Sequence, residues 1–79
     1  MAGKPLRFTK HAVTRILSLG FTEEDVEKVV AHGKKRREGK AKFKAALRTK
    51  KGFLIVTCLD HPDHILIVTI GKGGERRDW

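Results

Sequence analysis

The chain has 79 residues, 34% of them charged, and a formal net charge of +9. A chain of this length forms one domain with a modest core, which excludes a deep pocket for a large cofactor and favours a surface groove or shallow cleft. Its single cysteine excludes an intramolecular disulfide, and no apolar stretch approaches the ~20 residues of a membrane-spanning helix. We therefore expect one cytoplasmic domain over residues 1–79, without membrane contact and with flexible ends at residues 1–6 and 72–79.

Residues 8–19 are predicted to form the first helix. Thr9 can cap its beginning, and Gly20 stands where a helix commonly ends in a left-handed residue. His11 and Arg15 lie four residues apart and therefore share the polar face of this helix. The opposite face is an apolar stripe at helical spacing, formed by Ala12, Val13, Ile16 and Leu17.

A second helix is predicted over residues 21–32, with Gly33 at its end. Thr22 is the expected N-cap, and Asp25 follows three residues later, which is a variant of the capping box. The acidic residues of the first turn are explained by the helix dipole, which favours negative charge at this end. We therefore assign them no catalytic role.

The second half of the chain changes to patterns that are typical of strands. Residues 34–38 predict a short, charged edge strand, and residues 42–47 alternate between polar and apolar positions. Two nearly continuous apolar runs, residues 53–59 and 65–70, predict the central strands, joined by a turn. The order predicts an α+β fold in which two N-terminal helices pack on one face of a curled antiparallel sheet of about four strands.

Between residues 34 and 51 there are ten basic residues and one acid, so this segment carries the entire net charge of +9. Such clustering favours polyanion binding, above all RNA, whereas the alternative is a solvated face that protects an edge strand. In the predicted fold Lys42, Lys44 and Arg48 point away from the helices and form the RNA-contacting surface. The ten basic residues are Lys34, Lys35, Arg36, Arg37, Lys40, Lys42, Lys44, Arg48, Lys50 and Lys51.

Other residues with chemical potential are better explained by structure. Cys58 lies in an apolar run and is expected to be a small buried hydrophobe. Phe43 and Trp79 could stack on bases, although Phe43 fits the core more simply. Residues 71–74 lack the strand–loop–helix context of a phosphate loop. The absence of the thermolabile residues Asn and Gln, combined with many charged residues, is typical of thermophile proteins. Four residues are candidate metal ligands: Asp60, His61, Asp63 and His64. Their spacing matches no standard zinc pattern, so we expect no metal. We also expect no cofactor.

The two helices carry motifs that resemble a known family. Phe8-Thr9-Lys10-His11-Ala12 with Arg15, followed by Gly20-Phe21-Thr22-Glu23-Glu24-Asp25-Val26, resembles the small prokaryotic domain of unknown function 4258. Those domains read as an F-[ST]-x-H-A-x-x-R helix, a G-[IVF]-[ST]-x-x-[DE]-[IV] helix and a small sheet. The resemblance implies the RelE/barnase-like fold of RelE-type and BrnT-type toxin ribonucleases, often paired with an antitoxin. It places the family's polar positions on His11, Arg15 and Thr69, while the tyrosine that some relatives use has no counterpart here.

Three functions therefore remain open from the sequence. The first is an RNA-binding domain of toxin-like fold that cleaves RNA without a metal, using His11 as acid or base and Arg15 on phosphate. The second is a non-catalytic nucleic-acid-binding or protein-interaction module in which His11 is structural. The third is docking of an acidic antitoxin-like protein on the basic segment. The chain is expected to be a monomer or a homodimer through an exposed edge strand.

Overall fold

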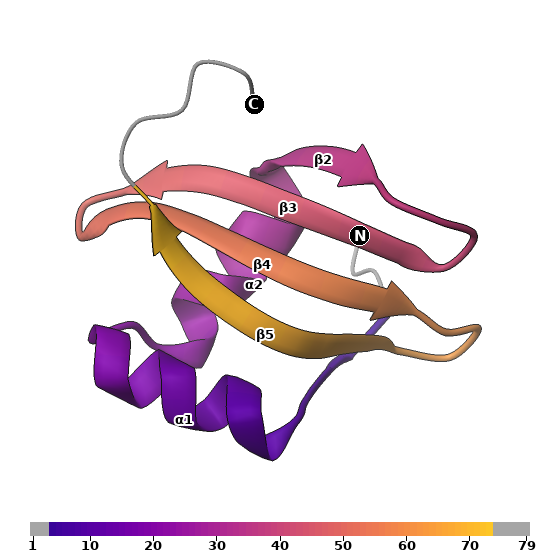
Figure 1. Cartoon of the computed structure of the whole chain (residues 1–79), viewed down its shortest axis with the longest axis horizontal. Coiled ribbons are helices and arrows are strands. Elements are labelled where there is room, and N and C mark those ends of the chain that lie inside the picture. The colour runs from indigo at the N-terminus through magenta and orange to yellow at the C-terminus, as the bar shows by residue number, and fades with distance from the viewer. Residues whose placement is uncertain (1–3, 74–79) are drawn as a thin grey trace.

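The computed structural model describes residues 4–73, which form two helices and five strands (Figure 1). In chain order the elements are β1 (Leu6–Phe8), α1 (Lys10–Leu19), α2 (Glu23–His32), β2 (Lys34–Arg37), β3 (Lys42–Thr49), β4 (Gly52–Asp60) and β5 (Ile65–Gly73).

Both helices begin and end at residues whose local chemistry predicts it. The Thr9 side chain accepts a hydrogen bond from the backbone N–H of Ala12, and Gly20 ends α1 in the left-handed conformation with φ 79°. Thr22 and Asp25 form the predicted capping box at the start of α2. The predicted caps are confirmed, and each helix starts two residues later than expected because its cap residue lies outside it.

The sheet has the strand order β1-β5-β4-β3-β2 and is open, with β1 and β2 at its edges. The predicted α+β fold is confirmed and β2 to β5 are antiparallel, but the sheet is mixed and not purely antiparallel, because β1 adds a fifth strand that pairs in parallel with β5. Leu6 lies opposite Ile65 and Phe8 lies opposite Ile67 in this pairing. A strand of three residues is too short to show a period in the sequence. Its parallel partner is more than fifty residues away, so no hairpin turn signals the pairing.

The helices cover one face of the sheet (Figure 1). α1 packs along β5, and α2 packs on β3 and β4. The core between the layers is formed by alternate strand residues, such as Leu54 and Val56, together with helix residues such as Val26 and Val29. The opposite face, which no helix of residues 4–73 covers, is called the helix-free face below.

Parts of the expected flexible ends belong to the folded structure. The Lys4 ammonium contacts the Asp60 carboxylate and donates a hydrogen bond to the His61 carbonyl oxygen at 2.7 Å. Lys72 and Gly73 belong to β5. The rest of those ends, including Trp79, lies outside the described residues. Within residues 4–73 neither helix is long and apolar enough to cross a membrane.

Candidate nucleic-acid interface

The pairing of β2 with β3 determines where the basic side chains point. Phe43 and Ala45 belong to the core, so the alternate residues of β3 point to the helix-free face. Lys34 lies opposite Ala46 and Arg36 lies opposite Lys44, and residues directly opposite in an antiparallel pair share a face. Five cationic side chains therefore form one continuous group on the helix-free face, here called the basic half: Lys34, Arg36, Lys42, Lys44 and Arg48.

The other basic residues of the segment lie elsewhere. Lys35 and Arg37 are opposite Ala45 and Phe43, so they point to the helix-covered side. There they line a hollow of about 340 Å³ together with Phe43 and Asp60. Lys40 lies in the loop between β2 and β3, and Lys50 and Lys51 lie in the turn between β3 and β4. The ten basic residues form one run in the sequence, but in the structure they belong to several separate groups.

The members of the basic half differ in their partners. Lys44 forms an ion pair with Glu38 at 3.6 Å between Nζ and Oε2. Lys34 and Lys42 are exposed and form no hydrogen bond or ion pair within residues 4–73. These two ammonium groups are therefore the members of the basic half most available to an anionic ligand.

Lys51 has a different role from the basic half. Its Nζ donates a hydrogen bond to Oδ2 of Asp25 at 2.9 Å and lies 5.7 Å from the centre of the Phe21 ring. The hydrogen bond from Lys51 and that from the backbone of Thr22 hold the pKa of the Asp25 carboxyl below its ordinary value. Lys51 therefore connects the β3–β4 turn to the start of α2.

His11, Arg15 and Thr69 are not grouped with the basic half. His11 is exposed on α1, on the helix-covered side, and has no hydrogen bond or ion pair within residues 4–73. The Nε of Arg15 donates a hydrogen bond to the Ile70 carbonyl oxygen at 3.1 Å, beyond the point where β1 stops pairing with β5. Thr69 is next to Ile70 but lies opposite Thr57 on the helix-free face. Arg15 therefore satisfies a carbonyl group at the free edge of β5.

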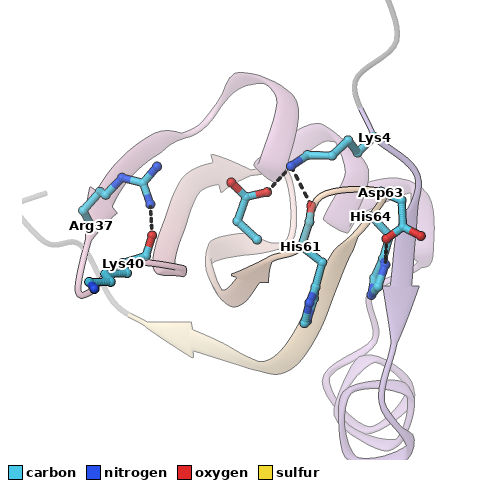
Figure 2. A network of polar contacts seen from close by, with 7 residues as sticks. Lys4, Arg37, Lys40, His61, Asp63 and His64 are labelled. Atoms are coloured by element: carbon cyan, nitrogen blue, oxygen red, sulfur yellow. Dashed lines mark hydrogen bonds and ion pairs between the residues drawn. The ribbon is translucent and has the colours of Figure 1, made fainter.

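The end of β4 and the turn that follows it carry the four residues considered as metal ligands. The rings of His61 and His64 stack with their centroids 4.5 Å apart. His64 Nδ1 lies 2.7 Å from the Asp63 carboxylate, and this contact lowers the pKa of Asp63. Figure 2 shows the neighbouring contacts of Lys4. Its hydrogen bond to the Asp60 carboxylate lowers the pKa of Asp60. No group of three or more potential ligands converges in the described part of the chain.

Cys58 is fully buried on the helix-covered side of β4. Burial raises the pKa of its thiol to about 12. The thiol therefore stays protonated at neutral pH and is not a nucleophile in the folded protein.

Two apolar residues of the run that the sequence predicts as a central strand lie on the helix-free face. Phe53 and Ile55 lie between residues that pack against the helices, and both are half-buried on the opposite side. The run from Phe53 to Leu59 contains little alternation of polar and apolar residues, so the sequence carried no signal that separates its two faces.

Comparison with known proteins gives one match. The family described as Domain of unknown function (DUF4258) matches residues 8–72. The chain belongs to this family. No curated protein matches it, and no solved structure does. The matched DUF4258 region begins in β1 and ends in β5, so it includes both helices and the whole basic half.

Proposed function

We propose that this DUF4258 domain binds RNA through the basic half of the helix-free face. The observation that carries the proposal is the position of three of the five cations on β3, an interior strand between β2 and β4. Lysines that protect a sheet from edge-to-edge pairing are needed on an edge strand. Edge protection therefore accounts for the charges of β2 but leaves Lys42, Lys44 and Arg48 unexplained.

Charge complementarity favours a polyanion as the ligand of this face. The basic half contains one nearby acid, Glu38, which pairs with Lys44. Side chains two residues apart on one strand face are ~7 Å apart and those on adjacent strands ~5 Å apart, so the cations form a compact group. A phosphate backbone can contact several such groups at once and releases counterions when it does so.

The test compares two double variants that lose the same charge. Lys34→Gln/Lys42→Gln removes two exposed cations of the basic half, whereas Lys10→Gln/Lys35→Gln removes two exposed cations on the helix-covered side. Binding of a labelled mixed-sequence single-stranded RNA is measured by fluorescence anisotropy at several salt concentrations. The first variant is expected to weaken binding and to reduce the slope of log K against log salt by ~1.4, at ~0.7 for each lost phosphate contact.

The control variant is expected to keep most of the wild-type slope. Equal losses in both double variants would show that net charge, not this face, attracts RNA. Binding that does not depend on salt would contradict the phosphate contacts altogether. If the wild type binds no RNA, the remaining candidate ligand of the basic half is an acidic, antitoxin-like protein.

A second candidate function is metal-independent RNA cleavage. With it goes the proposal that the domain is related to the RelE-type and BrnT-type toxins. The observation in its favour is that Arg15 uses only its Nε for the Ile70 carbonyl, which leaves its terminal nitrogens without a partner among residues 4–73. His11 lies one turn away on the same face of α1. Such an Arg could hold a phosphate while His11 transfers a proton.

Cleavage is tested with the same RNA in the presence of a chelator. The expected products carry 2′,3′-cyclic ends, and His11→Ala is expected to abolish cleavage while binding persists. His32→Ala is the matched control, because His32 is also exposed and lies at the end of α2. Equal activity of His11→Ala and the wild type would rule out this mechanism, and binding without cleavage by the wild type would leave a binding module.

A further inference from the structure

The helix-free face has a second half, formed by β4 and β5 beside the basic half. Phe53 lies between Arg48 on β3 and Gly73 on β5. In the next row Ile55 lies between Ala46 and Gly71. The two large apolar side chains are therefore flanked by one arginine and otherwise by residues with little or no side chain.

A bulge between β4 and β5 places these glycines on the helix-free face. Cys58 pairs with Ile67 whereas Thr57 pairs with Thr69, so Val68 is an extra residue on β5. After this bulge Ile70 points into the core, and the alternate positions Thr69, Gly71 and Gly73 point to the helix-free face.

The glycines leave space beside the apolar side chains. A Cβ added to Gly71 would meet no atom within 4 Å, so the surface there is open. A Cβ added to Gly73 would lie 3.4 Å from Cδ1 of Ile55 and 3.6 Å from Cδ2 of Phe53. The bare backbone of Gly73 therefore borders both apolar side chains. Neither glycine has a positive φ, so no backbone strain requires glycine at these positions.

We propose that Phe53 and Ile55, with Ala46, Gly71 and Gly73 around them, form a platform on which unpaired bases of a single-stranded RNA stack. This inference rests on the proposed function, because the phosphates of the same strand occupy the basic half. A base is flat and apolar on its faces, and base–aromatic stacking is tolerant of sequence because every base has a π-face. The open surface at Gly71, opposite Ile55 and one row from Phe53, provides room for such a ring.

The arrangement selects single strands over duplexes. In a duplex the base faces are covered by their neighbours, and double-stranded RNA is recognised by its shape and backbone. A duplex could therefore contact the basic half but would gain nothing from Phe53. Arg48, directly opposite Phe53, is placed to bind the phosphate of a nucleotide whose base lies on the platform.

The experiment uses three ligands of equal length and two variants. The ligands are a single-stranded RNA of about eight nucleotides, within the ~4–16 that one stacking domain covers, an abasic ribose–phosphate strand, and the same RNA as a duplex. Phe53→Leu keeps an apolar side chain but removes the π-face. Gly71→Val adds a branched side chain to the open surface in a residue type that strands favour.

The wild type is expected to bind the single-stranded RNA about tenfold more tightly than the abasic strand, which corresponds to the stacking of one base. Both variants are expected to lose about that factor for the single-stranded RNA and to leave the abasic strand and the duplex unchanged. Thermal unfolding of each variant verifies that the fold is intact. Gly71→Val serves as the second variant in case Phe53→Leu does not fold.

Failure of this inference is distinguishable from failure of the proposed function. If all three ligands bind equally, with the salt dependence of phosphate contacts, the basic half binds RNA but the platform does not exist. Unchanged affinity of both variants for the single strand would also overturn the platform. If none of the ligands binds, the proposed function fails and the platform fails with it.

Discussion

The two faces of the sheet are built from alternate residues of the same strands, yet they differ in what surrounds them. On β4, Leu54 is fully buried against the helices, whereas its neighbour Ile55 is half-buried on the helix-free face. On β3, Ala45 lies in the core, and its neighbours Lys44 and Ala46 point to the opposite side. The comparison teaches that position along the strand, more than residue type, decides whether a side chain packs in the core or lies on the helix-free face of this small domain. One face supplies the stability and leaves the other available for a ligand.

The largest expected effect tests this division on β4. Leu54→Ala removes a fully buried side chain and is expected to lower the free energy of unfolding by about 2–5 kcal/mol. Ile55→Ala removes a half-buried side chain that no helix covers, and it is expected to lower the free energy of unfolding by about 1 kcal/mol. Urea denaturation measures both changes. Equal costs would show that the helix-free face contributes to the fold as much as the core does.

A smaller effect compares two glycines. A Cβ on Gly33 would lie 2.5 Å from the Val29 carbonyl oxygen and 2.6 Å from that of Ala46, both of which are backbone atoms. Gly33→Ala is therefore expected to destabilise the protein by about 1–3 kcal/mol through overpacking. Gly71→Ala meets open space and is expected to stabilise it by about 0.5 kcal/mol, because alanine loses less backbone entropy in a strand.

The two glycine variants are compared by their melting temperatures. A loss of stability in Gly71→Ala would mean that the surface beside Ile55 is already occupied in the folded protein, which would contradict the open platform. A neutral Gly33→Ala would show that the contact between α2 and β3 can adjust.

The smallest effect concerns Lys51, a basic residue outside the basic half. The pKa of Asp25 is lowered in the folded state, so its ion pair with Lys51 stabilises the protein above the ordinary pKa of the carboxyl group. That stabilisation, about 0.5 kcal/mol for an exposed pair, is lost as the pH falls through the lowered pKa. Lys51→Gln is expected to remove it above ~pH 5 and to have little effect below ~pH 2.

Chemical denaturation of wild type and Lys51→Gln at several pH values measures this difference. RNA affinity of Lys51→Gln is expected to fall less than that of Lys42→Gln, an equal change of charge on the basic half. The reverse order would place the RNA-binding surface at the β3–β4 turn.

The sequence predicted those features that depend on local chemistry. The caps at Thr9 and Thr22 involve residues at most three positions apart, so neighbouring letters contain the whole signal. It missed β1, whose three residues form a strand only because β5 lies beside them. The sequence grouped Lys35 with Lys34 in one RNA-contacting surface, although the two residues face opposite sides of the sheet, and the reason is related. A run of like charges shows no alternation, and only the pairing with Ala45 and Ala46 reveals which side each residue faces.

Placement of the candidate catalytic residues also depended on contacts distant in sequence. The spacing of His11 and Arg15 correctly put them on one helix face. It could not show that Arg15 bonds to the Ile70 carbonyl, since that contact spans fifty-five positions. The platform residues Phe53 and Ile55 escaped notice because their neighbours are equally apolar.

The bulge at Val68 determines which residues of β5 lie beside Phe53 and Ile55 on the helix-free face. If Val68 paired with Thr57 without a bulge, every later residue of β5 would move to the opposite side of the sheet. Lys72 would then replace the bare backbone next to Phe53, and Ile70 would leave the core for the surface. Deletion of Val68 would instead keep the present sides, because Thr69 would follow Ile67 directly and still pair with Thr57. With Val68 present, the bulge is therefore what keeps Ile70 in the core and Gly71 and Gly73 on the helix-free face.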